Sequence, residues 1–507
     1  MKNELKKEKI ILEVIADIYI FVLVLLFPFI VDKTGFFHIM EIKWYSYVVI
    51  ASTYLGINLL VLLYFYIFKK INYFKNYKFT KIQLLLLVFL LVNTCSCFLS
   101  PYFSKANLFI GVGRGEGLIL VSLYTLSFLC ISIFSKFKRK YILYFSISSI
   151  LLSFIATLQY IGFNPFNMYQ DGIGTHNVSF MSTIGNIDFL SAIYCLLLPI
   201  SFAAYIFLED NNKLEKVLHI LSIYLGAFII GIIDVQSGKV ALLGTFVIVF
   251  PFILQTNKRL SKLLIVISAI LMAYCTNIII NPKYYYSLGK IVFNYQFTKF
   301  AALFIVISII LIILAKTLKN IQYDITSNKK IIKCYYLLLI ACGVVGLIGL
   351  YIINFKSGIL YEVHELLHGN FDDNFGTYRV FLWKRTINLV GEYPLLGSGP
   401  DTFAVRFMAK YTADIAKLGP VTINDTAANV YLTMLINIGI VGAINYLLFI
   451  YYQIKDGIKK ISSYSSILLI AIICYLIQDC FNLSIVIVTP IFWLMMGLHF
   501  SIIKNKK

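Results

Sequence analysis

The sequence predicts an all-α polytopic membrane protein with about fourteen transmembrane helices and one long extracellular loop. Hydrophobic residues make up 60% of the chain and charged residues only 13%, and the mean hydropathy is +0.84. Apolar runs of about 17 to 25 residues recur, and each is long enough to cross a hydrocarbon core of roughly 30 Å. One polar segment, residues 355–428, interrupts this series and predicts the loop.

The first apolar run follows a lysine-rich start and has no small-residue cleavage site, so we interpret it as a transmembrane helix and not as a signal peptide. The spans divide the chain into residues 1–354 with eleven helices, a loop at 355–428 with short interfacial helices, and residues 429–507 with three helices. Hydropathy places the fourteen spans at about 14–31, 44–68, 82–100, 117–135, 141–162, 183–208, 217–233, 239–255, 261–280, 297–315, 334–354, 429–452, 464–482 and 485–503.

The distribution of Lys and Arg predicts the orientation. Basic residues concentrate in alternate connections, including Lys69, Lys70, residues 136–140 and residues 504–507. Cytoplasmic loops carry this excess of positive charge. We therefore expect both termini in the cytoplasm and the 355–428 loop outside.

The net charge of +20 is mostly a topology signal and partly an attraction to anionic lipid headgroups of the bilayer. It does not imply nucleic acid. The nine cysteines are scattered through apolar runs, as small buried hydrophobic residues are. They support no disulfide framework, metal or cofactor.

The 355–428 loop contains a candidate anion site. Residues 377–391 have the pattern of a helix that lies along the membrane surface, with Trp383 at headgroup depth. A Gly-Ser-Gly-Pro turn at 397–400 exposes backbone N–H groups. Arg379, Lys384 and Arg385 are placed to hold an anionic group. The alternative is that these cations extend to lipid phosphates.

The same loop carries His-Glu-Leu-Leu-His at 364–368, which matches the zinc-protease pattern of two histidines one helical turn apart. Zinc needs a third protein ligand. The nearby candidates are only Glu362, Asp372 and Asp373, and Gly369 interrupts the segment. We favour a short interfacial helix over a metal site.

Two other external segments hold ionisable groups close to hydrocarbon, where such groups are usually functional. Arg114 and Glu116 lie in a glycine-rich loop before the fourth span, and Lys239 begins the eighth. We expect Arg114, Lys239 and Arg379 to converge on one polyanion. The acidic residues expected beside them are Asp188 and Asp479.

These segments resemble the O-antigen ligase and O-antigen polymerase-like membrane glycosyltransferases. The resemblance runs in order from Gly111 to the C-terminus. Its pieces are Arg-Gly-Glu-Gly-Leu at 114–118, Gly-Asn-Ile-Asp-Phe at 185–189, Gln-Ser-Gly-Lys at 236–239, Arg379 with Trp383, Pro-Leu-Leu-Gly-Ser-Gly-Pro at 394–400, and Thr-Pro-Ile-Phe-Trp at 489–493.

The family signature at the end of the loop is a histidine, then Asn, Ser or Gln, nine residues, a glycine, two residues, and Gly, Thr or Tyr. In this chain Asn429, Gly439 and Gly442 match. The catalytic histidine is replaced by Ala428. A lysine, Lys239, stands where the family usually has an arginine, which keeps the charge but loses the bidentate geometry.

The resemblance implies a GT-C-like architecture and transfer of a glycan from an undecaprenyl-diphosphate carrier to a hydroxyl of an acceptor glycan, lipid or protein. The reaction would take place on the outer face of the cytoplasmic membrane, without a metal. The cations would stabilise the leaving diphosphate, and a base would activate the hydroxyl. The resemblance places catalysis at position 428, Arg379 and Lys239, and substrate binding at Arg114, Glu116, Asn186, Asp188, Trp383 and Asn429.

Three explanations for Ala428 stay open: an inactive variant that keeps its substrate site, another base such as Asp425, Glu116 or Asp401, or a subgroup with different chemistry. Because the flanking residues are preserved, we favour the first. The alternative function is a flippase for lipid-linked polysaccharides. A flippase would need a deep cationic cavity and short loops, whereas here the cations lie at the external ends of the spans.

Overall fold

The computed structural model confirms a polytopic helical protein and describes residues 2–75, 77–161, 163–168, 182–285, 290–295, 298–321, 329–418 and 425–505. A helix coincides with each of the fourteen predicted spans. Eleven candidate spans among the described residues are long and apolar enough to cross a membrane. The helices α4, α16 and α17 are shorter, so the count of fourteen stays a prediction.

The N-terminal part of the chain forms a series of long helices. The first of them, α1, continues into a π-turn and a 3-10 turn at Pro28, whose ring cannot continue a helix. The buried ammonium of Lys43 donates to the freed carbonyls of Phe27 and Pro28 at 2.8 and 2.7 Å. The elements are α1 (Lys2–Phe21, then Val22–Leu26 and Phe27–Phe29), α2 (Ile39–Lys69), α3 (Lys81–Phe98), α4 (Leu118–Phe134), α5 (Lys140–Tyr160), a 3-10 turn (Pro165–Asn167), α6 (Ile187–Phe207), α7 (Lys213–Ile233), α8 (Gln236–Ile253) and α9 (Asn257–Ile279).

The rest of the chain contains the remaining spans and the loop. A short antiparallel hairpin, in which Ile280 pairs with Tyr295, is an exception to the predicted all-α class. The elements are β1 (Ile280–Tyr285), β2 (Lys290–Tyr295), α10 (Lys299–Asn320), α11 (Lys329–Ile352), α12 (Gly358–Leu367), α13 (Phe375–Val390), α14 (Phe403–Lys417), α15 (Val430–Lys459), α16 (Ser463–Gln478) and α17 (Thr489–Asn505).

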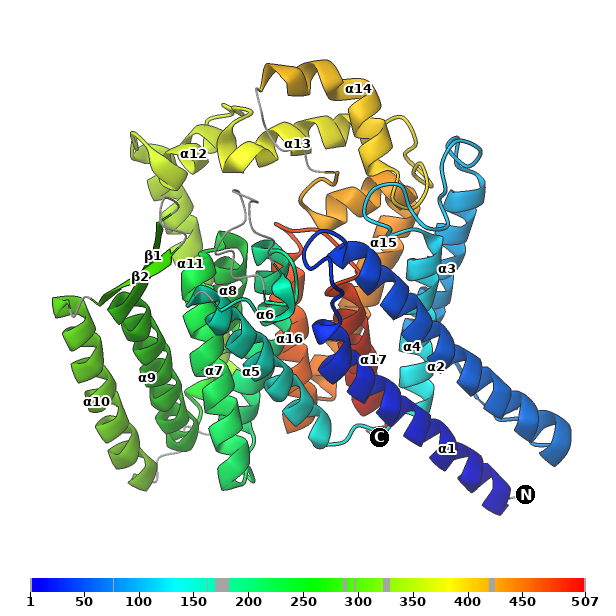
Figure 1. Ribbon diagram of the computed structural model, residues 1–507, viewed down its shortest axis with the longest axis horizontal. Helices are drawn as coiled ribbons and strands as arrows, with labels where there is room; N and C mark the ends of the chain where they lie inside the picture. Colours follow the sequence, from blue (N-terminus) through cyan, green and yellow to red (C-terminus); the bar gives the residue numbers. More distant parts are fainter. Residues whose placement is uncertain are drawn as a thin grey trace.

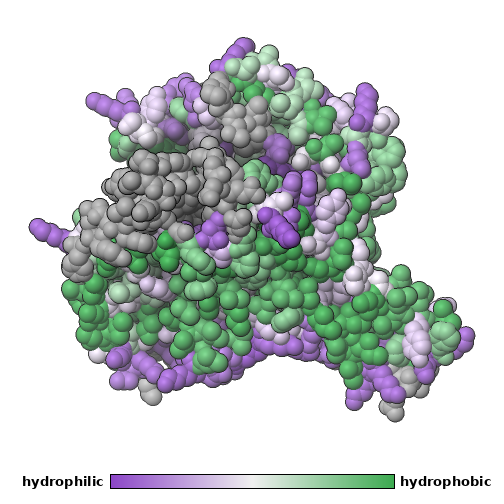
Figure 2. All heavy atoms as spheres, in the orientation of Figure 1, coloured by the Kyte–Doolittle hydropathy of each residue, from purple (hydrophilic) through white to green (hydrophobic). Residues whose placement is uncertain are grey.

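The helix α6 is the centre of the bundle. It packs against α5, α7, α8 and α16, and 94% of its most apolar window is buried. The corresponding window of α11 has no buried residues. A hydrophobic band crosses the middle of the surface, with hydrophilic residues above and below it (Figure 2). An exposed apolar surface of this extent is the surface expected to contact lipid.

Helices α12, α13 and α14 lie across one end of the bundle, and both termini lie at the other end (Figure 1). The predicted helix at 377–391 is confirmed by α13. The segment between α13 and α14 crosses α15 where that helix is interrupted at Gly439, which has φ 67° and ψ −174°.

Backbone hydrogen bonds join the two segments at this crossing. Ser398 and Gly399 donate to the carbonyls of Ile436 and Asn437 at 3.0 and 2.9 Å, and Ile440 donates to Pro394 at 2.8 Å. A Cβ at position 439 would collide with the carbonyl of Leu395. The crossing therefore gives a physical reason for both the 394–400 motif and the glycine of the α15 signature.

Candidate functional site

The glycine-rich loop before α4 wraps around the carboxylate of Asp401. One oxygen of Asp401 accepts hydrogen bonds from the backbone N–H groups of Gly113, Arg114, Gly115 and Glu116 at 2.9, 2.9, 3.0 and 3.3 Å. A Cβ at position 111, where φ is 107°, would collide with the same oxygen, so the close approach requires glycine there. Asp401 itself has a left-handed backbone with φ 59°. Although backbone donors favour its charged form, burial raises the pKa of Asp401 to about 6.

This loop fixes the position of the Arg114 side chain. Its Nε donates to Asp425 at 2.7 Å, and its guanidinium lies 5.9 Å from the centre of the Phe189 ring on α6. Within the described residues, its two terminal nitrogens have neither a hydrogen bond nor an ion pair. Arg114 therefore keeps the two donors that form a bidentate contact with a phosphate.

Glu116 lies beside Arg114 at the edge of a small cavity that both polar and apolar side chains line. Its carboxyl accepts from the hydroxyls of Tyr124 at 3.1 Å and Ser484 at 3.4 Å. Burial, with a smaller contribution from Asp401, raises the pKa of Glu116 to about 8. The cavity has a volume of about 100 Å³, and its lining includes Asn93, Arg114, Glu116, Asp401, Thr426, Val430, Thr433, Asn437 and Ser484.

Arg379 follows an unusual turn at the start of α13. Gly376, Thr377 and Tyr378 are all left-handed, with φ of 61°, 57° and 65°. Such a conformation is costly for a β-branched threonine, and strain of this kind clusters at functional sites. The guanidinium donates to the carbonyls of Gly376 at 3.1 Å and Phe481 at 3.4 Å. Its buried Nε–H has no acceptor among the described residues.

The N-terminus of α6 brings Arg114 and Arg379 to the same region. Asn186 caps the helix, because its side chain accepts from the backbone N–H of Asp188 at 2.7 Å. Arg379 lies close enough to Asp188 for an electrostatic interaction, and Arg114 lies over the next residue, Phe189. A helix N-terminus flanked by two cations is a favourable environment for an anion.

Position 428 lies under α13, next to the connection between α16 and α17. Ala428 is 7% exposed and has φ 48°. Asn429 caps α15 by accepting from Leu432 and donates its side-chain amide to Cys480 at 2.9 Å. Trp383 donates its indole N–H to the carbonyl of Ala427 at 2.9 Å. This contact holds the indole of Trp383 against the backbone beside position 428, and its depth in the membrane stays a prediction.

The other predicted cations have partners within the protein. Lys239 at the start of α8 pairs with Asp234, and within the described part of the chain its side chain makes no hydrogen bond or ion pair with any other residue. Lys384 and Arg385 both pair with Asp373, at 3.1 and 3.0 Å. Holding an anion would require these pairs to break. Of the three cations expected to converge, contacts therefore connect only Arg114 and Arg379, through α6.

The two histidines of the 364–368 motif contact backbone groups. The Nδ1 of His364 lies 2.8 Å from the carbonyl of Leu350, and the Nδ1 of His368 lies 2.8 Å from the carbonyl of His364. His368 also stacks on Tyr351 at 4.3 Å. The described residues contain no group of three His, Cys, Asp or Glu that could hold a metal ion.

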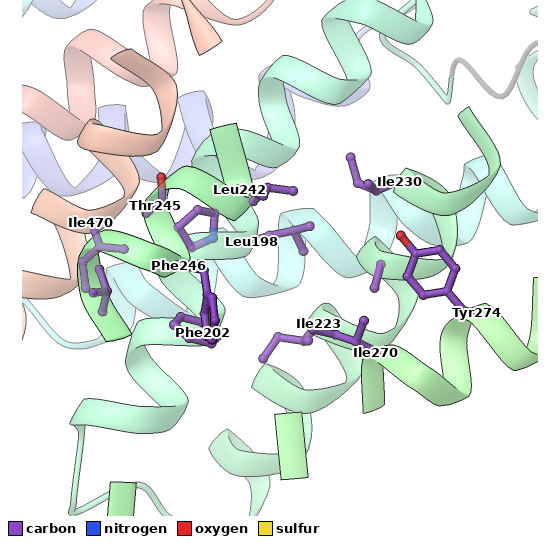
Figure 3. A pocket seen from close by; sticks show the side chains of 13 residues that line it. Leu198, Phe202, Ile223, Ile230, Leu242, Thr245, Phe246, Ile270, Tyr274 and Ile470 are labelled. Atoms are coloured by element: carbon purple, nitrogen blue, oxygen red, sulfur yellow. The ribbon is translucent and has the colours of Figure 1, made fainter. Parts of the chain in front are cut away.

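A separate apolar cavity of about 210 Å³ lies between α6, α7, α8, α9 and α16 (Figure 3). Its polar side chains are Thr245, which donates to Ala241 within its own helix, and Tyr274. The cavity can hold hydrocarbon. The lining is Leu198, Pro199, Phe202, Ile223, Ala227, Ile230, Leu242, Thr245, Phe246, Val249, Ile270, Tyr274 and Ile470.

Comparison with known protein families gives a match to one family over part of the chain. Residues 287–447, about a third of the chain, match the model of the family described as O-Antigen ligase. This segment is similar to O-antigen ligase. None of the curated proteins compared with it matches.

The match to O-antigen ligase covers α10 to α14 and most of α15. It therefore includes Arg379, Trp383, position 428 and the interrupted helix at Gly439. Arg114, Glu116, Asn186, Asp188 and Lys239 lie outside it.

Sequence reasoning about this chain missed several residues around the cavity. Tyr124 and Ser484 hold the carboxyl of Glu116, and Trp44 donates to the carbonyl of Gly115 at 2.9 Å. The only available signals were the glycines at 111–117 and the acidic residue after the 397–400 turn. Neither signal says that the two segments meet.

Proposed function

We propose that the chain is a membrane glycosyltransferase, a ligase or polymerase, that moves a glycan from an undecaprenyl-diphosphate carrier to an acceptor hydroxyl. The observation that carries the proposal is the cavity next to the loop that surrounds Asp401. There the two unpaired terminal nitrogens of Arg114 and the carboxyl of Glu116 face residues of α15. The O-antigen ligase match over 287–447 supports the same class of enzyme.

In this proposal Arg114 and Arg379 bind the diphosphate. Each has guanidinium N–H groups without an acceptor among the described residues, and both lie near the start of α6. Charge develops on the departing phosphate oxygen, and donors fixed in advance stabilise it without reorganisation. Lys239 would bind the diphosphate only after its ion pair with Asp234 breaks.

The acceptor hydroxyl needs a general base. Histidine would supply one at position 428, and Ala428 cannot. We favour a chain that binds its substrate and transfers slowly. Glu116 is the alternative base, because its raised pKa of about 8 keeps it able to exchange a proton near neutral pH.

The lipid part of the substrate would lie within the membrane-spanning part of the protein. The apolar cavity adjoining α6 suits a segment of the polyprenyl chain. We place the protein in the cytoplasmic membrane, with both termini inside and α12 to α14 outside. The opposite positions of these elements in the fold are consistent with this orientation (Figure 1).

Donor binding and transfer are measured separately to test the proposal. Purified protein in nanodiscs is mixed with a labelled undecaprenyl-diphosphate-linked glycan, and both retention and transfer to an acceptor are followed. We expect Arg114→Gln and Arg379→Gln to weaken retention by about tenfold or more each. The control Lys356→Gln, an exposed cation in the same external segment, should leave retention unchanged.

Liposomes distinguish the enzyme from a flippase. A glycan whose attachment changes supports transfer. A glycan that changes leaflet with its attachment intact identifies a transporter and overturns the proposal, as does donor retention that is the same in all three variants.

A further inference from the structure

A second charged cavity lies at the end of the bundle that carries the termini, opposite α12 to α14. Its volume is about 850 Å³, within the ~300–1,000 Å³ range of ligand pockets. Four elements form it: α1, the end of α2 with the connection to α3, the end of α4, and the end of α17. The lining is Lys9, Glu13, Lys70, Ile71, Asn72, Tyr73, Lys75, Tyr77, Ile133, Phe134, Ser135, Lys136 and Lys504.

The charge of this cavity is strongly positive. Five lysines line it and only one carboxylate does. That carboxylate, Glu13, pairs with Lys136. Lys504 donates to the hydroxyl of Tyr77 at 2.6 Å and lies 4.4 Å from the centre of its ring.

Two of the lysines have no partner. Within the described part of the chain, Lys70 and Lys75 make no side-chain hydrogen bond and no ion pair, and both are exposed. Lys70 ends α2 in a left-handed conformation with φ 53°, so the connection folds back over the cavity. The four lysines other than Lys136 do not pair with Glu13 and surround one space. Their charges repel one another unless an anion lies between them.

The apolar surroundings indicate which anion fits. Ile71, Ile133 and Phe134 line the cavity itself. Directly before it on α2, Ile67 and Phe68 are 51% and 71% exposed. A phosphate group in the cavity and acyl chains along these side chains would satisfy both surfaces. Basic pockets between helices at the cytoplasmic side are a known type of lipid-headgroup site.

We propose that this cavity binds the headgroup of an anionic phospholipid on the membrane face that carries the termini. This inference does not depend on the proposed transfer reaction. The basic cluster of Lys9, Lys70, Lys75 and Lys504 would then bind a ligand, in addition to the effect of its charge on the orientation of the chain in the membrane.

The test measures lipid retention by native mass spectrometry of the full chain, after exchange into nanodiscs of phosphatidylcholine with or without phosphatidylglycerol. The variant is Lys70→Gln/Lys75→Gln. The matched control is Lys316→Gln/Lys319→Gln, which removes the same charge from exposed positions at the end of α10. We expect phosphatidylglycerol to be retained by the wild type and the control, and about 30-fold more weakly by the cavity variant.

Thermal stability provides a second readout that does not require lipid to survive ionisation. Phosphatidylglycerol should raise the melting temperature of the wild type and the control, but not that of the cavity variant. Equal loss in both double variants would show an unspecific charge effect and overturn the proposal. Equal stabilisation by inorganic phosphate alone would show a soluble ligand and would also overturn it.

Discussion

Replacing Ala428 with histidine tests the proposed chemistry most directly. The backbone at this position suits histidine, because it is left-handed with φ 48° and histidine is among the residues that tolerate this region. The neighbouring residues are held in place: Asn429 donates to Cys480, and Val430 donates to the carbonyl of Asp479 at 2.9 Å. The new imidazole would therefore sit on a fixed backbone.

The expected magnitude follows from the role of a general base. Thr426 and Val430, on either side of position 428, line the 100 Å³ cavity with Arg114 and Glu116. A base placed there removes the hydroxyl proton during attack, which is worth about 10²- to 10⁴-fold in rate. We expect Ala428→His to raise glycan transfer by at least about 100-fold.

Single-turnover transfer in nanodiscs, measured across pH, is the assay. The neutral imidazole acts as the base, so the gain should appear as pH rises through about 6.5. The control Ala428→Gln adds a polar side chain of similar length without a base and should show no gain. A folded Ala428→His protein with an unchanged rate, or an equal gain in the glutamine control, would refute the role of histidine.

Three further predictions concern stability, each measured by thermal unfolding of the purified protein. Gly439→Ala should destabilise the protein by about 3 kcal/mol, because its Cβ meets the Leu395 carbonyl at a left-handed backbone. Gly343→Ala, which has open space around it, should instead stabilise the protein by up to about 1 kcal/mol. Equal effects of the two substitutions would contradict the crossing. Arg406→Ala should cost about 3 kcal/mol, since its guanidinium is buried against Leu389, Ser398 and Glu392. Lys410→Ala removes the exposed partner of the same Glu392 and should have a much smaller effect, because solvent screens exposed ion pairs. Asp401, whose pKa is raised to about 6 from 3.8, binds its proton more readily in the folded state, so stability should fall as pH rises from about 4 to 6, with a contribution from Asp401 on the order of 3 kcal/mol. Asp401→Asn should reduce this slope to the part that the raised pKa of Glu116 supplies, and an unchanged slope would contradict the role of Asp401.

The sequence predicted the membrane-spanning elements well because hydropathy is a local property. Each predicted span coincides with a helix, and the surface helix after Thr377 coincides with α13. The interruption of α15 at Gly439 was not predicted. Most residues around it are apolar, and the hydrogen bonds that accommodate the interruption come from distant parts of the chain, the 394–399 segment and the Ser96 hydroxyl of α3.

The site was harder to predict than the fold, because charge alone does not say which partner a side chain will choose. Arg114 and Arg379 were expected to share one site, which stays a prediction, and each contacts the first turn of α6. Lys239 and Arg385 looked equivalent to them in sequence, yet Lys239 pairs with Asp234 and Arg385 pairs through two nitrogens with Asp373 and Asp414, whereas Arg114 pairs with Asp425 through Nε alone. Asp401 was considered as a base, whereas its carboxylate is enclosed by four backbone N–H groups.

The crossing of the 394–399 segment over α15 has a consequence for membrane insertion. If α15 entered the bilayer alone, the carbonyls of Ile436 and Asn437 would lack the donors that Ser398 and Gly399 provide. Unsatisfied backbone groups are expensive at membrane depth. The interrupted shape of α15 therefore depends on residues 394–399, a segment that is made earlier and whose N–H groups pair with these carbonyls.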